Sequence, residues 1–568
     1  MPINDRVLFE WKACDTSVFS RLTAMTKDQG IIICGKGGDC APSNRLVNIL
    51  PHDAFTNLSL QNHHLPSFTA NTYRTDRPAV PLLSEVMHSK SIVGNTDQHK
   101  EEDQHSKEQH LQISDHKPHM EHLQNQTFQN WAKTFSCEPE LVLMAKTEDD
   151  VVQAIALARQ RSLKLRVVGS GHSPSDISCT NGIMLNIDAL NAVTKIDVET
   201  RQITIGAGIK LHQLNELLDR LGWALPNLGS ISEQSIAGAI STGTHGTGID
   251  FGVLAAMVLE LELITASGEK HTASRTVAPD LFLAALCSLG CLGVITQVTI
   301  QVVPAFQIKS TQKPIHFENM ISNFDKHLRS ADHVRFWWFP HTENCIVWKG
   351  ARTTEPPQPI KPNWMKDTLL GVHFYEMSLF ISTLVPAIVP TINKRFFDIF
   401  FGSPVSTIDK SFNVFNFDCL FSQYVTEWAI ECSKAPEALT RLKKFLEEHP
   451  EVVAHSPVEI RFVKRDDIYL SMANGHDTCF IGIIMYRPYG KDVDKETYWK
   501  GYESIMMDLG GRPHWAKEHH LTAKDLRARY PMFDAFCAIR ERMDPTNMFS
   551  NSYVERHIMD TAPMKAKL

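Results

Sequence analysis

The chain has 568 residues, of which 43% are hydrophobic and 21% charged, with a formal net charge of −7 at pH 7. This length predicts two or three domains. The mildly acidic balance provides no basic field, which excludes electrostatic nucleic-acid binding as the main function. The 12 cysteines show no C-x-x-C spacing and favour free thiols in a reducing compartment. Met1 to Glu10 has no apolar signal segment, so secretion is disfavoured.

Residues 1–126 differ in composition from the rest of the chain. Seven histidines lie between His88 and His122, and the last three are spaced three residues apart. A metal-binding tract and a solvated linker both explain this pattern. The linker is favoured because no cysteine or carboxylate completes a ligand set. We therefore predict a largely disordered, histidine-rich extension.

Strands alternate with helices from Phe128 to about residue 305. Glu148, Asp149 and Asp150 supply the acidic first turn of a helix. The predicted strands are 165–168, 183–187, 203–205, 258–264 and 294–303, and further helices are 211–221 and 279–289. The alternation predicts an α/β domain over 127–305. Aromatic strands and longer helices then predict a second domain over 306–510, giving an α+β chain.

One segment, 369–401, is rich in apolar residues. A membrane-spanning helix needs about 20 largely apolar residues, and Glu376, Pro386 and Pro390 interrupt this one. Lys394 and Arg395 flank it, which favours interfacial membrane contact over a buried helix pair. We expect membrane association through this segment.

Two segments rich in glycine, serine and threonine carry the most specific patterns. The first, V-G-S-G-H-S-P-S (168–175), is a turn after a strand, where backbone N–H groups can converge on an anion. The second, 228–248, contains S-I-S-E-Q-S-I-A-G-A-I-S-T-G-T-H-G. Without a Walker lysine or a Rossmann fingerprint, the pair argues against nucleotide hydrolysis and NAD binding. Each segment alone is compatible with an ordinary turn.

A third pattern is the E-x-R pair Glu459 and Arg461. Two residues apart on a strand, both side chains point to the same face. Such a pair is most often a structural ion pair, and it is also suited to binding a polar substrate.

Together these motifs resemble the FAD-binding (PCMH-type) domain of the vanillyl-alcohol oxidase superfamily, and within it the sugar-1,4-lactone oxidases. The resemblance runs from about Asn130 to His557 and includes F-W-W-F-P (336–340), V-E-I-R-F (458–462) and R-P-H-W-A-K (512–517). It implies a two-subdomain FAD-binding domain over 127–305 and a cap domain with an antiparallel sheet over 306–510. A C-terminal segment, 511–557, would return to the flavin, and 558–568 would be a tail.

The resemblance also implies the site residues. FAD would be joined covalently to His172. Further cofactor contacts would come from Val168, Gly169, Ser170, Gly171, Ser173, Gly229, Ser230, Ser232, Gly238, Ser241, Thr242, Gly243, Thr244, His245, Gly246 and Ile295. Glu459 and Arg461 would bind the lactone over the flavin, with Lys517 and His514 nearby; no metal is expected. Glycine at 229 and histidine at 172 favour an oxidase over a dehydrogenase.

The implied activity is oxidation of an aldono-1,4-lactone by O2, with hydrogen peroxide as co-product. D-arabinono-1,4-lactone is the first choice, giving erythroascorbate, and L-gulono- and L-galactono-1,4-lactone would give ascorbate. Three alternatives stay open: a cytochrome c-linked lactone dehydrogenase, an alditol oxidase, and a non-catalytic metal-binding or scaffold protein. The resemblance and the apolar segment imply the mitochondrial outer membrane or another intracellular membrane facing the cytosol.

Overall fold

The computed structural model describes residues 122–123, 126–417 and 421–559. Apart from β1 (His122–Leu123) and residue 126, the predicted N-terminal extension with its histidines lies outside these residues. Residues 560–568 of the predicted tail lie outside them too. The described residues all belong to one compact unit of the chain, residues 64–568.

A four-stranded sheet begins the described chain. Its order is β1, β4 (Leu141–Met144), β6 (Ile183–Asn186) and β5 (Leu165–Val168), with β4, β6 and β5 parallel. Helix α2 (Glu148–Arg161) connects β4 to β5. It starts where predicted because Thr147 and Asp150 form a capping box, each side chain accepting a hydrogen bond from the other's backbone N–H. The sheet ends with β5 leading directly into the segment that carries His172.

A five-stranded antiparallel sheet follows, in the order β11 (Lys270–Ser274), β10 (Val258–Ile264), β12 (Val294–Gln301), β8 (Gln202–Gly206) and β7 (Val193–Asp197). Helices α3 (Leu211–Arg220), α4 (Ile236–Ser241) and α5 (Pro279–Ala285) and the 3-10 turn η2 (Leu254–Met257) lie along its connections. A short pair, β9 (Trp223–Ala224) and β13 (Val303–Pro304), completes this region, and β2 (Phe128–Gln129) pairs with β3 (Ser136–Cys137) near its start.

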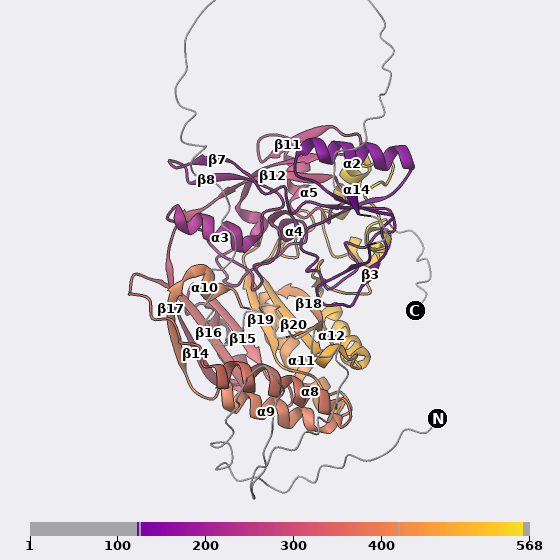
Figure 1. Cartoon of the computed structure of the whole chain (residues 1–568). Helices are drawn as coiled ribbons and strands as arrows, with labels where there is room; N and C mark the ends of the chain where they lie inside the picture. The colour runs from indigo at the N-terminus through magenta and orange to yellow at the C-terminus, as the bar shows by residue number, and fades with distance from the viewer. Residues whose placement is uncertain (1–121, 124–125, 418–420, 560–568) are drawn as a thin grey trace, which may run out of the picture. The chain divides into compact units, whose positions relative to one another are not determined.

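An eight-stranded antiparallel sheet dominates the second half (Figure 1). Its order is β17 (Val405–Lys410), β14 (Gln307–His316), β16 (Asn344–Thr353), β15 (His333–Trp338), β19 (Val458–Val463), β20 (Thr478–Tyr486), β18 (Gln423–Glu431) and β21 (Arg512–Pro513). Its helices are α6 (Phe317–Ser322), α7 (Phe324–Leu328), α10 (Ser411–Phe415), α11 (Ala435–Glu448) and α12 (Glu496–Asp508). The first strand of this sheet in chain order, β14, begins at Gln307, close to where the sequence changes to aromatic strands and longer helices. The domain boundaries themselves stay predictions.

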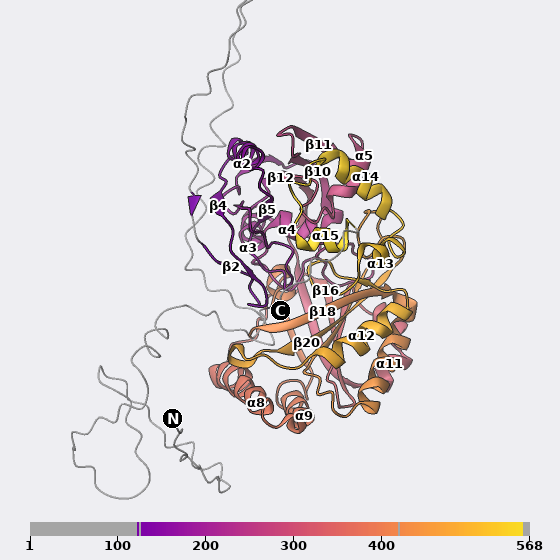
Figure 2. The same cartoon turned by 90° about the vertical axis from the view of Figure 1, so that its right-hand side faces the viewer.

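The apolar segment 369–401 forms a helical layer on this sheet. With the residues just before it, the layer comprises η3 (Trp364–Phe374), α8 (Tyr375–Ser382), η4 (Pro386–Ile388) and α9 (Val389–Phe400), and α8 and α9 lie side by side in both views (Figures 1 and 2). Their inner faces bury Tyr375, Leu379 and Phe396 against Trp337 and Phe339 of the sheet region. Among the described residues, no helix has the length and apolar character needed to cross a membrane.

The C-terminal segment packs back onto the first sheet. Helices α13 (Ala523–Arg527), α14 (Phe533–Met543) and α15 (Ser552–His557) follow β21. The backbone N–H of Leu165 donates to Met548 O at 2.8 Å, and the buried Arg166 guanidinium donates to Phe549 O at 2.8 Å. These contacts hold β5, and therefore the segment after it, against the end of the chain.

Candidate active site

The segment after β5 places His172 in the wall of two internal cavities. Gly169 packs so closely that a Cβ there would lie 2.2 Å from Ser235 Oγ, and Gly171 adopts a φ of +63°. Both positions require glycine, the first for close approach and the second for its left-handed backbone. The two glycines therefore allow the backbone of this turn to approach neighbouring groups more closely than a residue with a side chain would.

The His172 imidazole is mostly buried and lies near Trp131, whose ring is stacked with it at a centroid distance of 5.8 Å. Burial, opposed in part by Glu233, lowers the pKa of His172 to about 4. Its Nδ1 is buried with no hydrogen-bond partner among the described residues. At neutral pH this side chain is therefore an uncharged imidazole with an unused ring nitrogen, the state of a competent nucleophile.

Two cavities meet at His172, which lines both together with Gln234. We call the first the loop cavity; the predicted cofactor residues that line it are Gly169, Ser170, Gly171, His172, Ser173, Gly238, Ser241, Thr242 and Ile295. We call the second the sheet cavity; the predicted residues that line it are His172, Gly229, Ser230, Thr244, His245, Glu459, Arg461, His514 and Lys517. The tertiary structure thus brings together motifs separated by hundreds of residues.

Four predicted cofactor residues in the described part of the chain line neither cavity: Val168, Ser232, Gly243 and Gly246. Gly246 instead allows a tight turn, since a Cβ there would lie 2.3 Å from Asn227 Oδ1. Gly243 has a φ of +68° and faces Met472. Gly243 and Gly246 thus shape the backbone path of the second segment, whose neighbouring residues Thr244 and His245 line the sheet cavity.

Strand register explains how the sheet cavity acquires its charges. Glu459 on β19 and Glu427 on β18 both pair with Gly482 on β20, so the two carboxylates lie in one row across three strands. Gly482 has no side chain to fill the space between them. Arg461, two residues after Glu459 and on the same face, extends into this gap.

Arg461 binds both carboxylates. Its Nη2 lies 2.6 Å from Glu427 Oε1, and its Nε lies 3.3 Å from Glu459 Oε2. Trp337 Nε1 donates to Glu459 Oε1 at 3.2 Å and fixes that carboxylate. The predicted Glu459–Arg461 ion pair is confirmed, but the shorter contact is made to Glu427, which no sequence motif marked.

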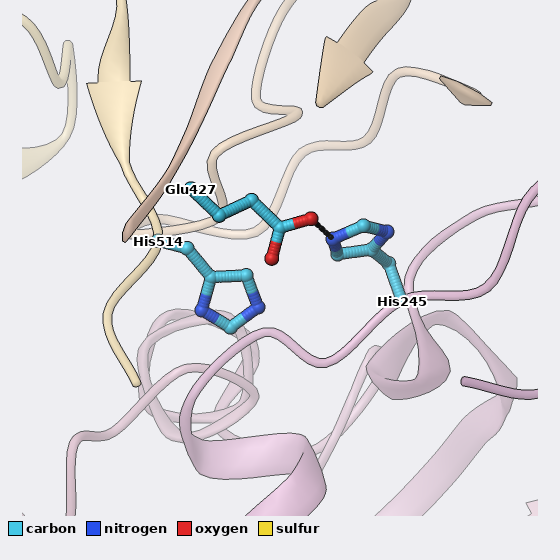
Figure 3. Close-up of side chains that lie close together, drawn as sticks. All are labelled: His245, Glu427 and His514. Carbon is cyan, nitrogen blue, oxygen red and sulfur yellow. Dashed lines mark ion pairs between the residues drawn. The ribbon is translucent and has the colours of Figure 1, made fainter. Parts of the chain in front are cut away.

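Glu427 is fully buried between two imidazoles (Figure 3). His245 Nε2 lies 3.5 Å from Glu427 Oε1, and the His514 ring is 5.5 Å from that of His245 between centroids. Burial would raise the pKa of Glu427, but Arg461 and His245 outweigh this and hold it well below its usual range. Burial lowers the pKa of both histidines. The centre is therefore an ionised carboxylate between two neutral imidazoles.

This trio has the donor set of a metal site, with ligand atoms within 4.8 Å of one another. However, the carboxylate already carries a full positive partner in Arg461, and a divalent ion there would face the guanidinium across a low-dielectric interior. The ion pair by itself accounts for the buried charge. We therefore assign the trio to holding Arg461 in place.

Sequence reasoning missed Glu427, Gly482 and Arg335. Arg335 pairs with Arg461 across β15 and β19, lines the sheet cavity, and lies over the ring of Trp348 at 4.5 Å. Burial lowers its pKa to about 10, so it stays charged at neutral pH. Arg335 stands one residue before the recognised F-W-W-F-P motif, the only signal that could have marked it. Nothing local distinguishes Glu427 or Gly482 from other strand residues.

The loop cavity fits FAD. More than half of its lining residues are glycine, serine or threonine, including Gly169 and Gly293, where a Cβ would lie 2.2 and 2.6 Å from other atoms. Such a wall lets backbone N–H groups and hydroxyls approach phosphate oxygens. His172, whose buried Nδ1 has no hydrogen-bond partner among the described residues, lines both the loop cavity and the sheet cavity, the position required of a residue next to a redox ring.

Comparison with known proteins agrees with this geometry. Residues 139–274 match the family model "FAD binding domain", and residues 298–557 match the model "D-arabinono-1,4-lactone oxidase". L-gulonolactone oxidase of Bos taurus is 46% identical, over 76% of this chain and 97% of its own length. A putative D-arabinono-1,4-lactone oxidase of Neurospora crassa is 37% identical, over 76% and 85%.

Among solved structures, a cholesterol oxidase from B. sterolicum superimposes with a TM-score of 0.66 at 17% identity, covering 77% of this chain and 97% of the other. At this identity the likeness shows the fold alone. The two family models, together with the loop cavity, define a flavoprotein oxidoreductase that uses FAD. Within that class, the chain belongs to the family of the sugar-lactone oxidases.

Proposed function

We propose that this protein oxidises an aldono-1,4-lactone at C2 and passes the electrons to dioxygen, giving hydrogen peroxide and a 2-keto lactone that enolises to ascorbate or its five-carbon analogue. The observation that carries this proposal is the sheet cavity, where His172, the Glu459–Arg461 pair and Lys517 meet. FAD, when bound, supplies the two-electron chemistry and the reaction with dioxygen.

The charged and polar residues of the sheet cavity have separate roles in this reaction. Arg461, fixed from two sides, donates hydrogen bonds to the substrate oxygen on which negative charge develops. Glu459 accepts the hydrogen bond of a substrate hydroxyl and assists removal of its proton. His514 Nδ1 accepts a hydrogen bond from the Ala516 backbone N–H at 3.1 Å. The neutral imidazole therefore carries its proton on Nε2, which can donate a hydrogen bond. The backbone N–H of Lys517 donates a hydrogen bond to His514 O at 2.9 Å. The Lys517 side chain adds a positive charge near His172.

The preferred lactone follows from the relatives only in part. The matching family model carries the name D-arabinono-1,4-lactone oxidase, whereas the 46% identical relative is an L-gulonolactone oxidase. The two lactones differ by one CHOH unit of side chain, and differences of this size discriminate weakly. We propose both as substrates, with L-galactono-1,4-lactone as a third.

The test is to supply purified protein with each lactone and with xylitol, and to measure oxygen consumed and peroxide formed. We expect turnover with the lactones and little with xylitol. Turnover with xylitol alone would identify an alditol oxidase instead. Replacing oxygen by cytochrome c in the same assay separates an oxidase from a dehydrogenase: faster reduction of cytochrome c than of oxygen would contradict the proposed acceptor.

We also propose that His172 is joined covalently to the flavin. Its uncharged state, its unused Nδ1 and its place between the two cavities support this. Acid precipitation of the purified protein tests it directly. Yellow colour in the pellet is expected; colour only in the supernatant would leave FAD bound without the link.

Finally, we propose that the helical layer 364–401 docks on a phospholipid surface, at the mitochondrial outer membrane or another intracellular membrane facing the cytosol. Most of the exposed large apolar side chains of the described chain lie here, including Leu384 at 71%, Met365 at 63% and Trp364 at 62% exposure. Exposed Lys394 and Arg395 beside them suit anionic headgroups. Exposed apolar side chains combined with cations on the same short run of helices are characteristic of interfacial helices.

Sedimentation with vesicles of phosphatidylcholine and phosphatidylserine tests this docking. The triple variant Trp364→Ser, Met365→Ser, Leu384→Ser is expected to lose vesicle binding. Val198→Ser serves as the matched control. It removes an apolar side chain that is as exposed as Leu384 but lies in the turn between β7 and β8. Equal sedimentation of the triple variant and the control would overturn the proposal.

A further inference from the structure

Two half-buried cysteines, Cys137 and Cys179, meet beside the segment that carries His172. Cys137 ends β3, and Cys179 precedes β6. The Cys179 thiol hydrogen-bonds to the Cys137 sulfur. The backbone N–H of Thr180 donates to the same Cys137 Sγ at 3.3 Å. The two thiols are thus in direct contact although 42 positions separate them in the chain.

Cys137 belongs to a hairpin that covers His172. Phe128 on β2 pairs with Cys137 on β3, and Trp131 lies between the strands. Trp131 donates its backbone N–H to Gly171 O at 2.9 Å, in addition to stacking with His172. We call residues 128–137 the hairpin. A change at Cys137 therefore acts on the same hairpin whose Trp131 contacts His172 and Gly171.

Cys179 belongs to the opposite, anchored side. Asn551 Nδ2 donates to Cys179 O at 2.9 Å and to Ile177 O at 3.0 Å. The fully buried Arg166 guanidinium also donates to Ile177 O, at 2.7 Å. The segment carrying Cys179 is therefore tied to β5 and to the C-terminal helices, whereas the hairpin is tied to the site mainly through its own loop.

We propose that Cys137 and Cys179 form a reversible disulfide, driven by hydrogen peroxide, that fastens the hairpin over His172. The Cys137 thiolate attacks one peroxide oxygen, giving a sulfenic acid and hydroxide, which takes a proton to become water. The Cys179 thiolate, formed by loss of its proton, then displaces the sulfenic hydroxyl as a second water. Two thiols lose two electrons, and one peroxide becomes two waters.

The proposed oxidase reaction would supply the peroxide as its co-product. The inference rests on the proposed function only for this supply of peroxide. The local chemistry selects Cys137 among the described thiols. The hydrogen bond from Cys179, opposed by burial and aided by Thr180, lowers the pKa of Cys137. Burial raises the pKa of Cys537 to about 11. Cys137 therefore has the larger thiolate fraction at pH 7, and we expect it to react at least several-fold faster with peroxide than Cys537.

The experiment treats reduced holoprotein with hydrogen peroxide and maps peptides by mass spectrometry without reduction. We expect a Cys137–Cys179 crosslinked peptide that dithiothreitol removes. In Cys179→Ser, a sulfenic acid at Cys137 should persist and react with dimedone. In Cys137→Ser, Cys179 should stay reduced. Cys537→Ser is the matched control and should crosslink like the unsubstituted protein.

Hydrogen exchange of the hairpin supplies a second readout. Amides of residues 128–137 should exchange several-fold more slowly in the crosslinked protein than in the reduced one. Oxidation of Cys537 at the rate of Cys137, or no crosslink with peroxide, would overturn the inference. Repeating the treatment with lactone and oxygen in place of peroxide separates the two proposals: crosslinking by added peroxide alone would contradict the oxidase function and leave the disulfide standing.

Discussion

The Arg461 guanidinium lies 2.6 Å from the Glu427 carboxylate, although the two residues come from strands that are not neighbours in the sheet. The contact crosses β20 at Gly482, where the missing side chain leaves the space open. Because Glu427 is buried and ionised, it holds the arginine in one orientation before any substrate arrives. Preorganised charge of this kind needs no reorganisation during the reaction.

Replacing the arginine should therefore remove a transition-state interaction. Arg461→Ala is expected to lower kcat/KM with a lactone by at least roughly 30-fold, equivalent to about 2–3 kcal/mol. The control is Arg275→Ala, which removes an arginine from an exposed ion pair with Asp467. Steady-state kinetics of both variants check this. A kcat/KM for Arg461→Ala close to that of the control would exclude a role for Arg461 in catalysis.

Glu427 acts through Arg461 and is a positioning residue. Glu427→Gln keeps the side-chain shape but removes the charge, so the guanidinium is left with Glu459 alone. We expect kcat/KM per bound flavin to fall at least roughly 10-fold, with a loss in unfolding free energy of up to about 3–5 kcal/mol. Glu427→Asp restores the charge and should recover part of the activity. If the aspartate variant is no better than the glutamine variant, charge is not what positions Arg461.

The flavin link depends on one side chain. His172→Ala should leave flavin that acid extracts into the supernatant, because no other imidazole of the described residues lines both cavities. His245→Ala is the comparison, since His245 lines the sheet cavity only. The visible spectra of pellet and supernatant check the result. Flavin retained in the His172→Ala pellet would show that another residue carries the link.

Gly229 should control access of oxygen. It lines the sheet cavity, and a Cβ there would lie 3.2 Å from His245 O and 3.3 Å from Thr244 Cγ2, a crowded but tolerable position. Gly229→Ala is expected to slow turnover with oxygen several-fold while leaving turnover with a dye acceptor nearly unchanged. The ratio of the two rates is the measurement. An equal fall in both would mean that Gly229 serves only the path of its loop.

Glu503 on α12 should make stability depend on pH. Burial, together with the nearby Glu518, raises its pKa to about 7, from an unfolded value near 4.5. The folded state therefore holds this proton more tightly. Its favourable contribution is complete below pH 4.5 and is lost as pH rises to about 7, a change of about 3 kcal/mol.

Glu503→Gln stays neutral and removes this dependence. We expect its melting temperature to exceed that of the unsubstituted protein by a larger margin at pH 8 than at pH 5. Thermal unfolding at the two pH values provides the comparison. Parallel curves would show that Glu503 is already ionised at pH 5.

The sequence predicted local elements well where local signals define their ends. Strands 165–168 and 258–264 have their predicted bounds. The helix predicted over 279–289 ends at Ala285, and it could not have reached its predicted end, since Leu289 adopts a φ of +52°. The strand predicted over 294–303 ends at Gln301, where the Val302 N–H leaves the ladder to bond Arg201 O at 3.1 Å.

By itself, the sequence determined the family, the FAD segment with His172 and the E-x-R pair, since each of these is a run of neighbouring residues with a recognisable pattern. Only the tertiary structure decided which side chains share a site. Glu427, Arg335 and the Cys137–Cys179 contact arise from strand register and chain packing, which join residues far apart in the chain. No spacing records such contacts, because register is set by the whole sheet and not by any one strand.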